Sequence, residues 1–372
     1  MVQILQLAQQ TKPGSLPYEI ETRLFWHAFM MDVWHSGCFE YPRQLQAKTS
    51  MPLPLEEEVF ENMTPADDEP SGLDGVEITD EMRQGSIMAN VVRLHMTYAD
   101  ITQLNRILVH EPHFTFLRDR EVQRLSSELR DWLRGLPAHL RNTPENLEAF
   151  AAKSRGREFA VLHIIYHHQC QLLYYQYLQW ASSAPLEAGP VEEEISRRVA
   201  RCKAHAEALS ALMWTMNTSA GSECLWSPVN GHLLVVASSI HLHSLLFDND
   251  CGDTDDASSS SRVTRIRQLL EQNFVMLLQF QKYWPTLKAS LCRLAVFHRS
   301  CYRRGREQSF RMDSWMLDFL TKHNVAMEER GEEGEGDMVP DGVGDAEMMW
   351  SWLSDGNENA TQDLLLESLS FS

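Results

Sequence analysis

The chain has 372 residues, of which 43% are hydrophobic, and its 33 Lys and Arg against 52 Asp and Glu give a formal net charge of −19. This length and apolar content suffice for one large core or two smaller ones without disulfides or structural metal. The charge excludes a protein that itself follows a phosphate backbone, because that task needs clustered Lys and Arg.

The cysteines argue against a disulfide framework and against a zinc site. Their number is odd, and no two have the two-residue spacing typical of zinc ligands. We interpret them as reduced thiols of an intracellular protein, and we expect no cofactor and no metal. Residues 1–12 lack the basic start, apolar run and cleavage site of a secretory signal. The seven cysteines are Cys38, Cys170, Cys202, Cys224, Cys251, Cys292 and Cys301.

Apolar residues recur every three or four positions along most of the chain, which is typical of α-helices. The pattern begins at Leu24 to Met31 and continues from Val91 to Leu108. Strand-like alternation is hard to find. The sequence therefore predicts an all-α, multi-helix globular fold, in which several helices are separated by prolines. Further helices are expected at residues 118–134, 157–180, 191–217, 229–247, 263–284 and 287–301.

Two of these predicted helices should be enclosed by the others. Residues 166–180 are apolar or aromatic on nearly every side, and such a helix has no face for solvent. Residues 231–247 are the most apolar stretch, but they include three histidines and are short for a bilayer, which needs about 20 apolar residues. We therefore expect a buried helix there and no contact with a membrane.

We expect one helical domain at residues 1–327 and an acidic tail at residues 328–372. Two segments inside the domain are predicted to be exposed loops, one near 56–85, rich in acids, Pro and Gly, and one near 248–261, which ends in a serine run. In the tail, thirteen acidic residues face a single base, Arg330. Such a segment cannot form its own core, so we predict a disordered tail.

Several groups of residues are candidates for catalytic or metal sites. His163 and His167 lie one helical turn apart, but the acidic base of a zinc-protease helix is absent, so we favour packing histidines. Asp248 and Asp250 belong to a cluster in which the glycine and glutamate of a calcium loop are misplaced, so we favour a solvated loop. The other acids of this cluster are Asp253, Asp255 and Asp256.

A basic stretch near residues 293–306 has two interpretations. It can serve as a nuclear-import or DNA-binding patch, or it can be the charged rim of a packed helix. Apolar residues between the arginines favour the packed helix. The arginines are Arg293, Arg299, Arg303, Arg304 and Arg306.

The tail contains apolar groups held among acids. Charge repulsion keeps such groups solvated and available for a coactivator groove, where the segment would fold into a short helix. The alternative is a C-terminal helix that docks back on the domain. The candidate coactivator-binding residues are Met348, Met349, Trp350, Trp352 and Leu353.

The N-terminal helix carries the clearest resemblance to a known family. The run Glu21-Thr22-Arg23-Leu24-Phe25-Trp26, followed by Asp32, resembles the signature of the fungal-specific transcription factor regulatory domain, also called the middle homology region. The likeness continues through Pro42, the proline-bearing run at residues 51–54 and the acids at residues 56–58. It extends to a helix ending in Trp132 and Leu136-Pro137, and in all it covers roughly residues 2–302.

The resemblance implies a transcription regulator in the nucleus, of the kind that controls metabolic or biosynthetic gene clusters, including secondary metabolism. Its fold would be a helical regulatory domain without catalytic residues. Family members usually carry a binuclear zinc cluster with six closely spaced cysteines, which these 372 residues lack. The start near Met1 therefore indicates a shortened gene model, a shortened chain or a natural form without the DNA-binding zinc cluster. DNA contact is expected only indirectly or through a missing segment.

The expected partners are the transcription coactivator machinery and a zinc cluster transcription factor, as a homo- or hetero-dimer. A competitor subunit of a full-length factor is an alternative. A cavity lined by Trp26, Tyr166 or Tyr174 is a candidate for a small effector. The rival class is an all-helical metal-dependent enzyme of the terpene cyclase type, whose acidic motif would be at residues 67–69. A purely structural helical scaffold ranks last, because no fixed repeat is found.

Overall fold

A computed structural model describes residues 13–39, 42–47, 51–63, 79–110, 115–181, 190–218, 227–248, 257–303, 312–322 and 327. Over these residues the secondary structure is helical and contains no strand, which confirms the predicted all-α class. The predicted disordered tail at residues 328–372 lies outside the described part of the chain. The structure divides into two compact units, Met1–Gln169 and Cys170–Ser372, and the boundary falls inside helix α8 (Gly156–Tyr174).

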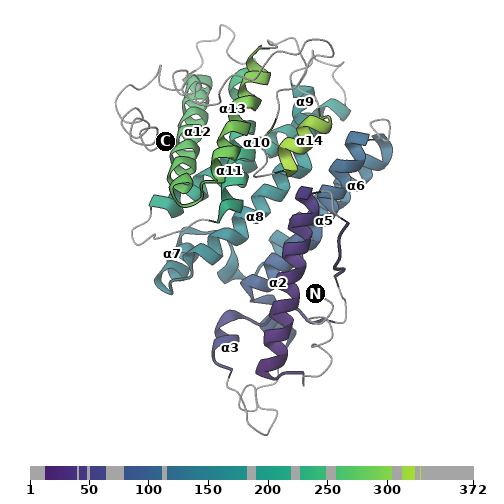
Figure 1. The fold of residues 1–372 in the computed structure, drawn as a ribbon, viewed down its shortest axis with the longest axis vertical. Helices are drawn as coiled ribbons and strands as arrows, with labels where there is room; N and C mark the ends of the chain where they lie inside the picture. The colour runs from purple at the N-terminus through teal and green to yellow at the C-terminus, as the bar shows by residue number, and fades with distance from the viewer. Residues whose placement is uncertain are drawn as a thin grey trace. The chain divides into compact units, whose positions relative to one another are not determined.

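The first unit is built around α2 and α5, which pack against each other, with α6 against α5 (Figure 1). On α2 the apolar side chains at positions 25, 26, 29 and 33 are buried together, as the helical spacing requires. Trp34 of α2 stacks on Tyr98 of α5, with ring centroids 5.5 Å apart. The elements of this unit before α8 are α2 (Leu16–Phe39), α3 (Glu57–Glu61), α4 (Asp80–Gln84), α5 (Ile87–His110), α6 (Thr115–Gly135), η1 (Ala138–Leu140) and α7 (Pro144–Ala152).

The second unit is organised around α11 (Pro228–Phe247), which contacts α10, α12 and α13 (Figure 1). Gly231 lets α13 approach closely, because a Cβ there would lie 2.4 Å from Leu287 Cδ2. The other elements are η2 (Tyr175–Tyr177), α9 (Leu178–Ala181), α10 (Pro190–Thr218), α12 (Ala257–Tyr283), α13 (Leu287–Arg303) and α14 (Ser314–Thr321).

A buried polar network joins α10, α11 and α12. The Asn273 side-chain amide donates to Ser210 Oγ at 3.0 Å and to Ser238 Oγ at 3.1 Å. Ser210 Oγ is in turn 3.0 Å from Nε2 of His241. Burial lowers the pKa of His241 to about 3, so the imidazole is neutral in this network. The two hydrogen bonds satisfy the amide N–H groups of Asn273 inside the core.

The predicted buried helices are confirmed. Nearly every side chain from Tyr166 to Leu178 is buried. In α11 the segment from Asn230 to Ser244 is also buried. One described helix, α11, passes a test of length and hydropathy for a membrane span, and 83% of its most apolar window is buried within the protein. Its apolar character therefore serves the core of the second unit.

The helix predictions hold for the long elements and miss short ones. Helices α5, α6, α10, α11, α12 and α13 appear where periodicity indicated them, whereas the predicted single helix at residues 157–180 is divided into α8, η2 and α9. Helix α7 was not predicted, although Thr143 caps it by accepting a hydrogen bond from the Asn146 N–H at 3.2 Å and Pro144 occupies its first turn. Nine residues are too few for a clear period. Helix α14 was also missed.

The segments predicted as loops are partly helical. The segment 56–85 contains α3 and α4, and residues 64–78 between them lie outside the described structure. Helix α12 starts at Ala257 and therefore takes in the end of the segment 248–261. The serine run at residues 258–261 forms the first turn of that helix, which continues without interruption into the periodic apolar segment.

The described cysteines Cys170, Cys202, Cys292 and Cys301 are reduced thiols. Burial raises the pKa of the Cys202 thiol, with Lys203 opposing the shift. A buried thiol of this kind is unreactive.

Candidate functional site

The family-like positions of α2 attach this helix to the extended segments that follow it. The indole N–H of Trp26 donates to the Pro52 carbonyl oxygen at 2.7 Å, and the indole is 1% exposed. The guanidinium of Arg23 donates to the Leu55 carbonyl at 2.7 Å. Asp32 accepts hydrogen bonds from the backbone N–H groups of Gln44 at 2.9 Å and Leu45 at 2.8 Å. These positions therefore fix the path of the proline-bearing segment.

The remaining family-like positions contribute to the same helix. Phe25 is buried and packs edge-on against Trp26, with ring centroids 5.0 Å apart. Glu21 lies half-buried on α2.

A buried carboxylate that the sequence analysis did not select completes this arrangement. Glu19 is 2% exposed, and its Oε1 accepts a hydrogen bond from the Leu55 N–H at 2.8 Å. Arg23 Nε lies 3.2 Å from the same oxygen, and Arg83 Nη1 lies 3.6 Å from Oε2. Burial raises the pKa of Glu19, and the hydrogen bond and the two arginines offset this only in part. The spacing of Glu19 and Arg23, four residues apart on a helix, was the available signal.

Helix α3 provides a second carboxylate that organises the neighbouring helix. Glu57 accepts hydrogen bonds from the backbone N–H groups of Ile87 and Met88, each at 3.1 Å, and from Ser86 Oγ at 3.2 Å. The first N–H groups of a helix have no partner within it, and an anion there is favoured by the helix dipole. Glu57 thus caps α5 from a distance of about thirty residues in sequence.

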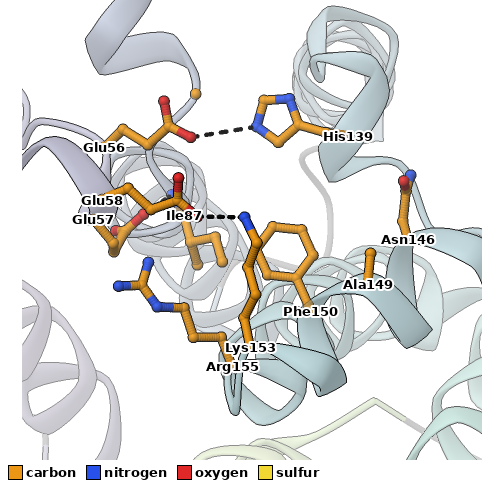
Figure 2. Close-up of a pocket in the computed structure, with 11 residues that line it drawn as sticks. Glu56, Glu57, Glu58, Ile87, His139, Asn146, Ala149, Phe150, Lys153 and Arg155 are labelled. Atoms are coloured by element: carbon orange, nitrogen blue, oxygen red, sulfur yellow. Dashed lines mark hydrogen bonds and ion pairs between the residues drawn. The ribbon is translucent and has the colours of Figure 1, made fainter.

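Next to this cap lies a pocket of about 210 Å³. Figure 2 shows three consecutive glutamates on one side and residues from η1, α7 and the following turn on the other. Phe150, Ala149 and Ile87 supply its apolar surface. The lining residues are Glu56, Glu57, Glu58, Gly85, Ile87, His139, Asn146, Ala149, Phe150, Lys153 and Arg155.

Most charges of the pocket already have partners. Glu58 pairs with Lys153, which holds the pKa of the Glu58 carboxyl below its usual value. Arg155 pairs with Glu61. Glu56 Oε1 lies 4.0 Å from His139 Nε2 (Figure 2), and its Oε2 packs where Gly85 has no side chain, 3.0 Å from the position of a Cβ. Glu56 is therefore the lining acid best placed to accept a hydrogen bond from a small polar molecule.

The described residues contain no group of three or more His, Cys, Asp or Glu placed to hold a metal ion. His163 Nε2 donates a hydrogen bond to the Leu140 carbonyl oxygen at 2.9 Å, and the imidazole lies edge-on to Phe159 with ring centroids 4.8 Å apart. This confirms the interpretation of His163 as a packing residue. Its neighbour His167 lies against Tyr166, with ring centroids 5.3 Å apart.

The predicted acidic and basic clusters are only partly within the described structure. Asp248 pairs with Lys203 and lies 3.6 Å from Arg262. Arg293 is 2% exposed and donates to the carbonyls of Asp318 and Phe319, each at 2.7 Å. This supports a packed helix rather than a basic patch at that position. Residues 67–69, Asp250, Asp253, Asp255, Asp256, Arg304 and Arg306 lie outside the described residues, as do the side chains of Arg299 and Arg303.

The residues of the proposed tail site lie outside the described structure, whereas the rings proposed to line an effector cavity lie within it. Met348, Met349, Trp350, Trp352 and Leu353 lie outside the described residues. The rings suggested as cavity walls are in packed contacts: Trp26 against Phe29 at 5.4 Å, and Tyr166 stacked on Trp132 at 5.3 Å. Neither they nor Tyr174 line the pocket in Figure 2.

Residues 4–134 match the family model described as the fungal specific transcription factor domain. The matched range includes α2, α3 and the clamp, by which we mean the hydrogen bonds of Glu19, Arg23 and Trp26 to the backbone of Pro52 and Leu55, and it stops before η1 and α7. The comparison with curated proteins gave no match. The comparison with solved structures gave none either.

Proposed function

Because the chain contains a fungal specific transcription factor domain at residues 4–134, we propose that it regulates transcription of a metabolic or biosynthetic gene cluster in the nucleus. The matched family is a regulatory domain. The clamp on α2 supports a rigid scaffold role for this part, since its conspicuous polar residues bond to the protein's own backbone. The function is therefore assigned to binding and regulation.

DNA contact is assigned to a zinc cluster partner or to a segment beyond these residues. A formal charge of −19 opposes direct contact with phosphates. A partner that carries the zinc cluster would supply the basic surface and the base-reading side chains. The helical body would then bind that partner, as a homo- or hetero-dimer.

The acidic tail is proposed to recruit the coactivator machinery. Its thirteen acids speed the encounter with a basic rim, while Trp350 and Leu353 provide aromatic and aliphatic anchors for a groove. Ordering such a segment costs conformational entropy, so binding depends on a few buried side chains.

The test is a reporter assay with the full chain, and separately residues 328–372, fused to an unrelated DNA-binding module. Trp350, Trp352 and Leu353 are changed together to Ala, which should abolish activation. Met338→Ala with Val339→Ala is the matched control, because it also shortens apolar side chains in the tail and leaves every acid in place. Equal activity in both variants, or no activity in the parent, would contradict the proposal that the tail activates transcription.

A competitor subunit makes a different prediction in the same cells. Overproducing the untethered chain should then lower the output of a full-length zinc cluster relative, and removing residues 328–372 should not relieve the inhibition. An activator loses its effect when those residues are removed.

A further inference from the structure

The pocket beside the α5 cap is lined by segments that all belong to the first unit (Figure 2). Glu56 and the start of α3 form one wall, and η1, α7 and the turn after α7 form the other. Gly85 and Ile87 line it where α4 ends and α5 begins. The shape of the pocket therefore follows from the packing of helices within one unit.

The volume of this pocket suits a small organic molecule. An apolar cavity of about 150 Å³ holds one benzene molecule. A pocket of about 210 Å³ therefore admits a ring with a short side chain, about nine non-hydrogen atoms in all. Ile87, Ala149 and Phe150 offer such a molecule apolar contacts. The ring of Phe150 is supported from behind, because it stacks on Phe159 with ring centroids 4.9 Å apart.

The charged side chains of the lining carry an excess of negative charge. Three glutamates line the pocket together with one lysine and one arginine. Glu58 forms an ion pair with Lys153, and Arg155 pairs with Glu61, which is not part of the lining. A carboxylate or phosphate ligand would meet this excess of like charge. The lining therefore favours a cation over an anion.

Of the three lining glutamates, Glu56 is the one placed to receive a cation. Glu57 is occupied by the first turn of α5, whose backbone N–H groups donate to its carboxylate. Glu56 Oε1 lies 4.0 Å from His139 Nε2 (Figure 2), which is longer than a hydrogen bond. The backbone at this position is fixed, since the Glu56 N–H donates to the Met82 carbonyl at 2.9 Å. An ammonium group can thus approach a carboxylate held at the edge of the pocket.

We propose that this pocket binds a small organic cation in which a primary ammonium group is joined to an apolar ring or chain. The ammonium group forms an ion pair with Glu56, and the apolar part lies against Ile87, Ala149 and Phe150. A hydrogen bond between two charged groups is stronger than one between neutral groups, so the head group decides which molecules bind. The inference goes beyond the proposed function and does not depend on it.

The experiment is a ligand-observed NMR titration of the full chain with three probes that share a phenyl ring and a two-carbon spacer. Phenethylammonium carries the cationic head group, phenethyl alcohol the neutral one and hydrocinnamate the anionic one. For a ligand of this size we expect a dissociation constant of about one millimolar or below for phenethylammonium. The alcohol should bind at least about tenfold more weakly, and hydrocinnamate should bind most weakly of the three.

Glu56→Gln tests the ion pair directly. This change keeps the shape of the side chain and removes its charge, so it should weaken the binding of phenethylammonium by at least about tenfold. The affinity for the alcohol should stay unchanged, which also shows that the pocket of the variant is folded. Glu148→Gln is the matched control, because Glu148 is exposed on the same helix as Phe150 but does not line the pocket. It removes the same charge and should leave both affinities unchanged.

A second variant places a competing cation beside the carboxylate. His139→Lys puts a permanent ammonium group where the imidazole now lies 4.0 Å from Glu56. The His139 side chain is 49% exposed, so the fold should tolerate the change. Phenethylammonium should bind this variant more weakly than the wild type. Combining it with Glu56→Gln should cost less affinity than the sum of the two single changes, because both act through one carboxylate.

The proposal is overturned if the wild type binds none of the three probes, or binds phenethylammonium no more tightly than the alcohol. Wild-type affinity of the Glu56→Gln variant for phenethylammonium would also overturn it. Equal losses in the Glu56→Gln and Glu148→Gln variants would do the same, because the affinity would then come from the overall negative charge of the chain and not from the pocket.

Discussion

The Glu19 carboxylate accepts a hydrogen bond at 2.8 Å from the backbone N–H of Leu55, which lies 36 residues further along the chain. Arg23 donates to the carbonyl of the same Leu55 at 2.7 Å. Both polar groups of one residue in the extended segment are thus satisfied by side chains one turn apart on α2. This pairing explains why an acid and an arginine at this spacing are needed in an otherwise apolar helix face.

Glu19→Gln should make stability less dependent on pH than it is in the wild type. Burial raises the pKa of Glu19 above its usual 4.5 in the folded state, so the folded protein binds this proton more tightly than the unfolded chain. Ionisation of Glu19 therefore lowers wild-type stability as pH rises from 4.5 through the folded-state pKa. In urea unfolding between pH 4 and 7, the free energy of unfolding of the Gln variant should rise relative to that of the wild type as the pH increases.

Glu19→Ala should be far more damaging than Glu19→Gln near neutral pH. Alanine leaves the Leu55 N–H without an acceptor and leaves two arginines beside a buried cavity, at a cost of about 3 to 5 kcal/mol. Glutamine keeps an acceptor for the N–H. Similar unfolding midpoints for the two variants would contradict a role for the Leu55 hydrogen bond.

His163→Gln should protect the protein against mild acid. Burial lowers the pKa of His163 to about 4, from an ordinary value of 6.5, so the unfolded chain takes up this proton first. Wild-type stability should fall as pH drops from 6.5 towards 4, by up to about 1.4 kcal/mol per unit from this group. A glutamine amide can still bond to the Leu140 carbonyl without titrating. Parallel stability curves for the two proteins would refute the assignment.

Arg293→Ala should release helix α14 from the second unit. The guanidinium donates to the carbonyls of Asp318 and Phe319 and lies 5.6 Å from the centre of the Phe319 ring. Its loss removes a buried donor from both carbonyls, of which that of Asp318 still accepts from the Lys322 N–H, and we expect a cost of about 1 to 3 kcal/mol. Hydrogen exchange at residues 314–321 should rise strongly. Lys322→Ala removes an exposed pair with Asp318 and should leave the exchange nearly unchanged.

Gly231→Ala should destabilise the contact between α11 and α13. The added methyl would lie 2.4 Å from Leu287 Cδ2, and Leu287 is fully buried, so the side chain has little room to move. We expect a loss of about 1 to 3 kcal/mol in thermal or urea unfolding. Combining it with Leu287→Ala should cost less stability than the sum of the two single changes. The Leu287→Ala change removes the side chain that clashes with the added methyl, and that methyl partly fills the cavity left by Leu287.

The sequence by itself determined the helical class, the long helices and the buried character of α11, because these follow from local spacing and composition that each segment carries alone. The family resemblance directed attention to Glu21, Arg23, Phe25, Trp26 and Asp32. Their roles were decided by tertiary structure, since Arg23, Trp26 and Asp32 bond to backbone groups of the segments that follow α2 and Phe25 packs against Trp26. Glu19 and Glu57 were overlooked for the same reason: an acid in a helix or acidic run resembles any solvated acid until its partner is known.

Tertiary structure also decided where the pocket lies and which helix face is left exposed. The pocket joins Glu56 to Glu58 with residues 139–155, and no local pattern relates segments so far apart. The periodicity of α2 indicates that one face is buried, but Leu24 and Met31 read as core residues in sequence and are about half exposed in the fold. Helix α2 has apolar residues on two faces and packs against α5, and only three-dimensional packing determines which face is buried.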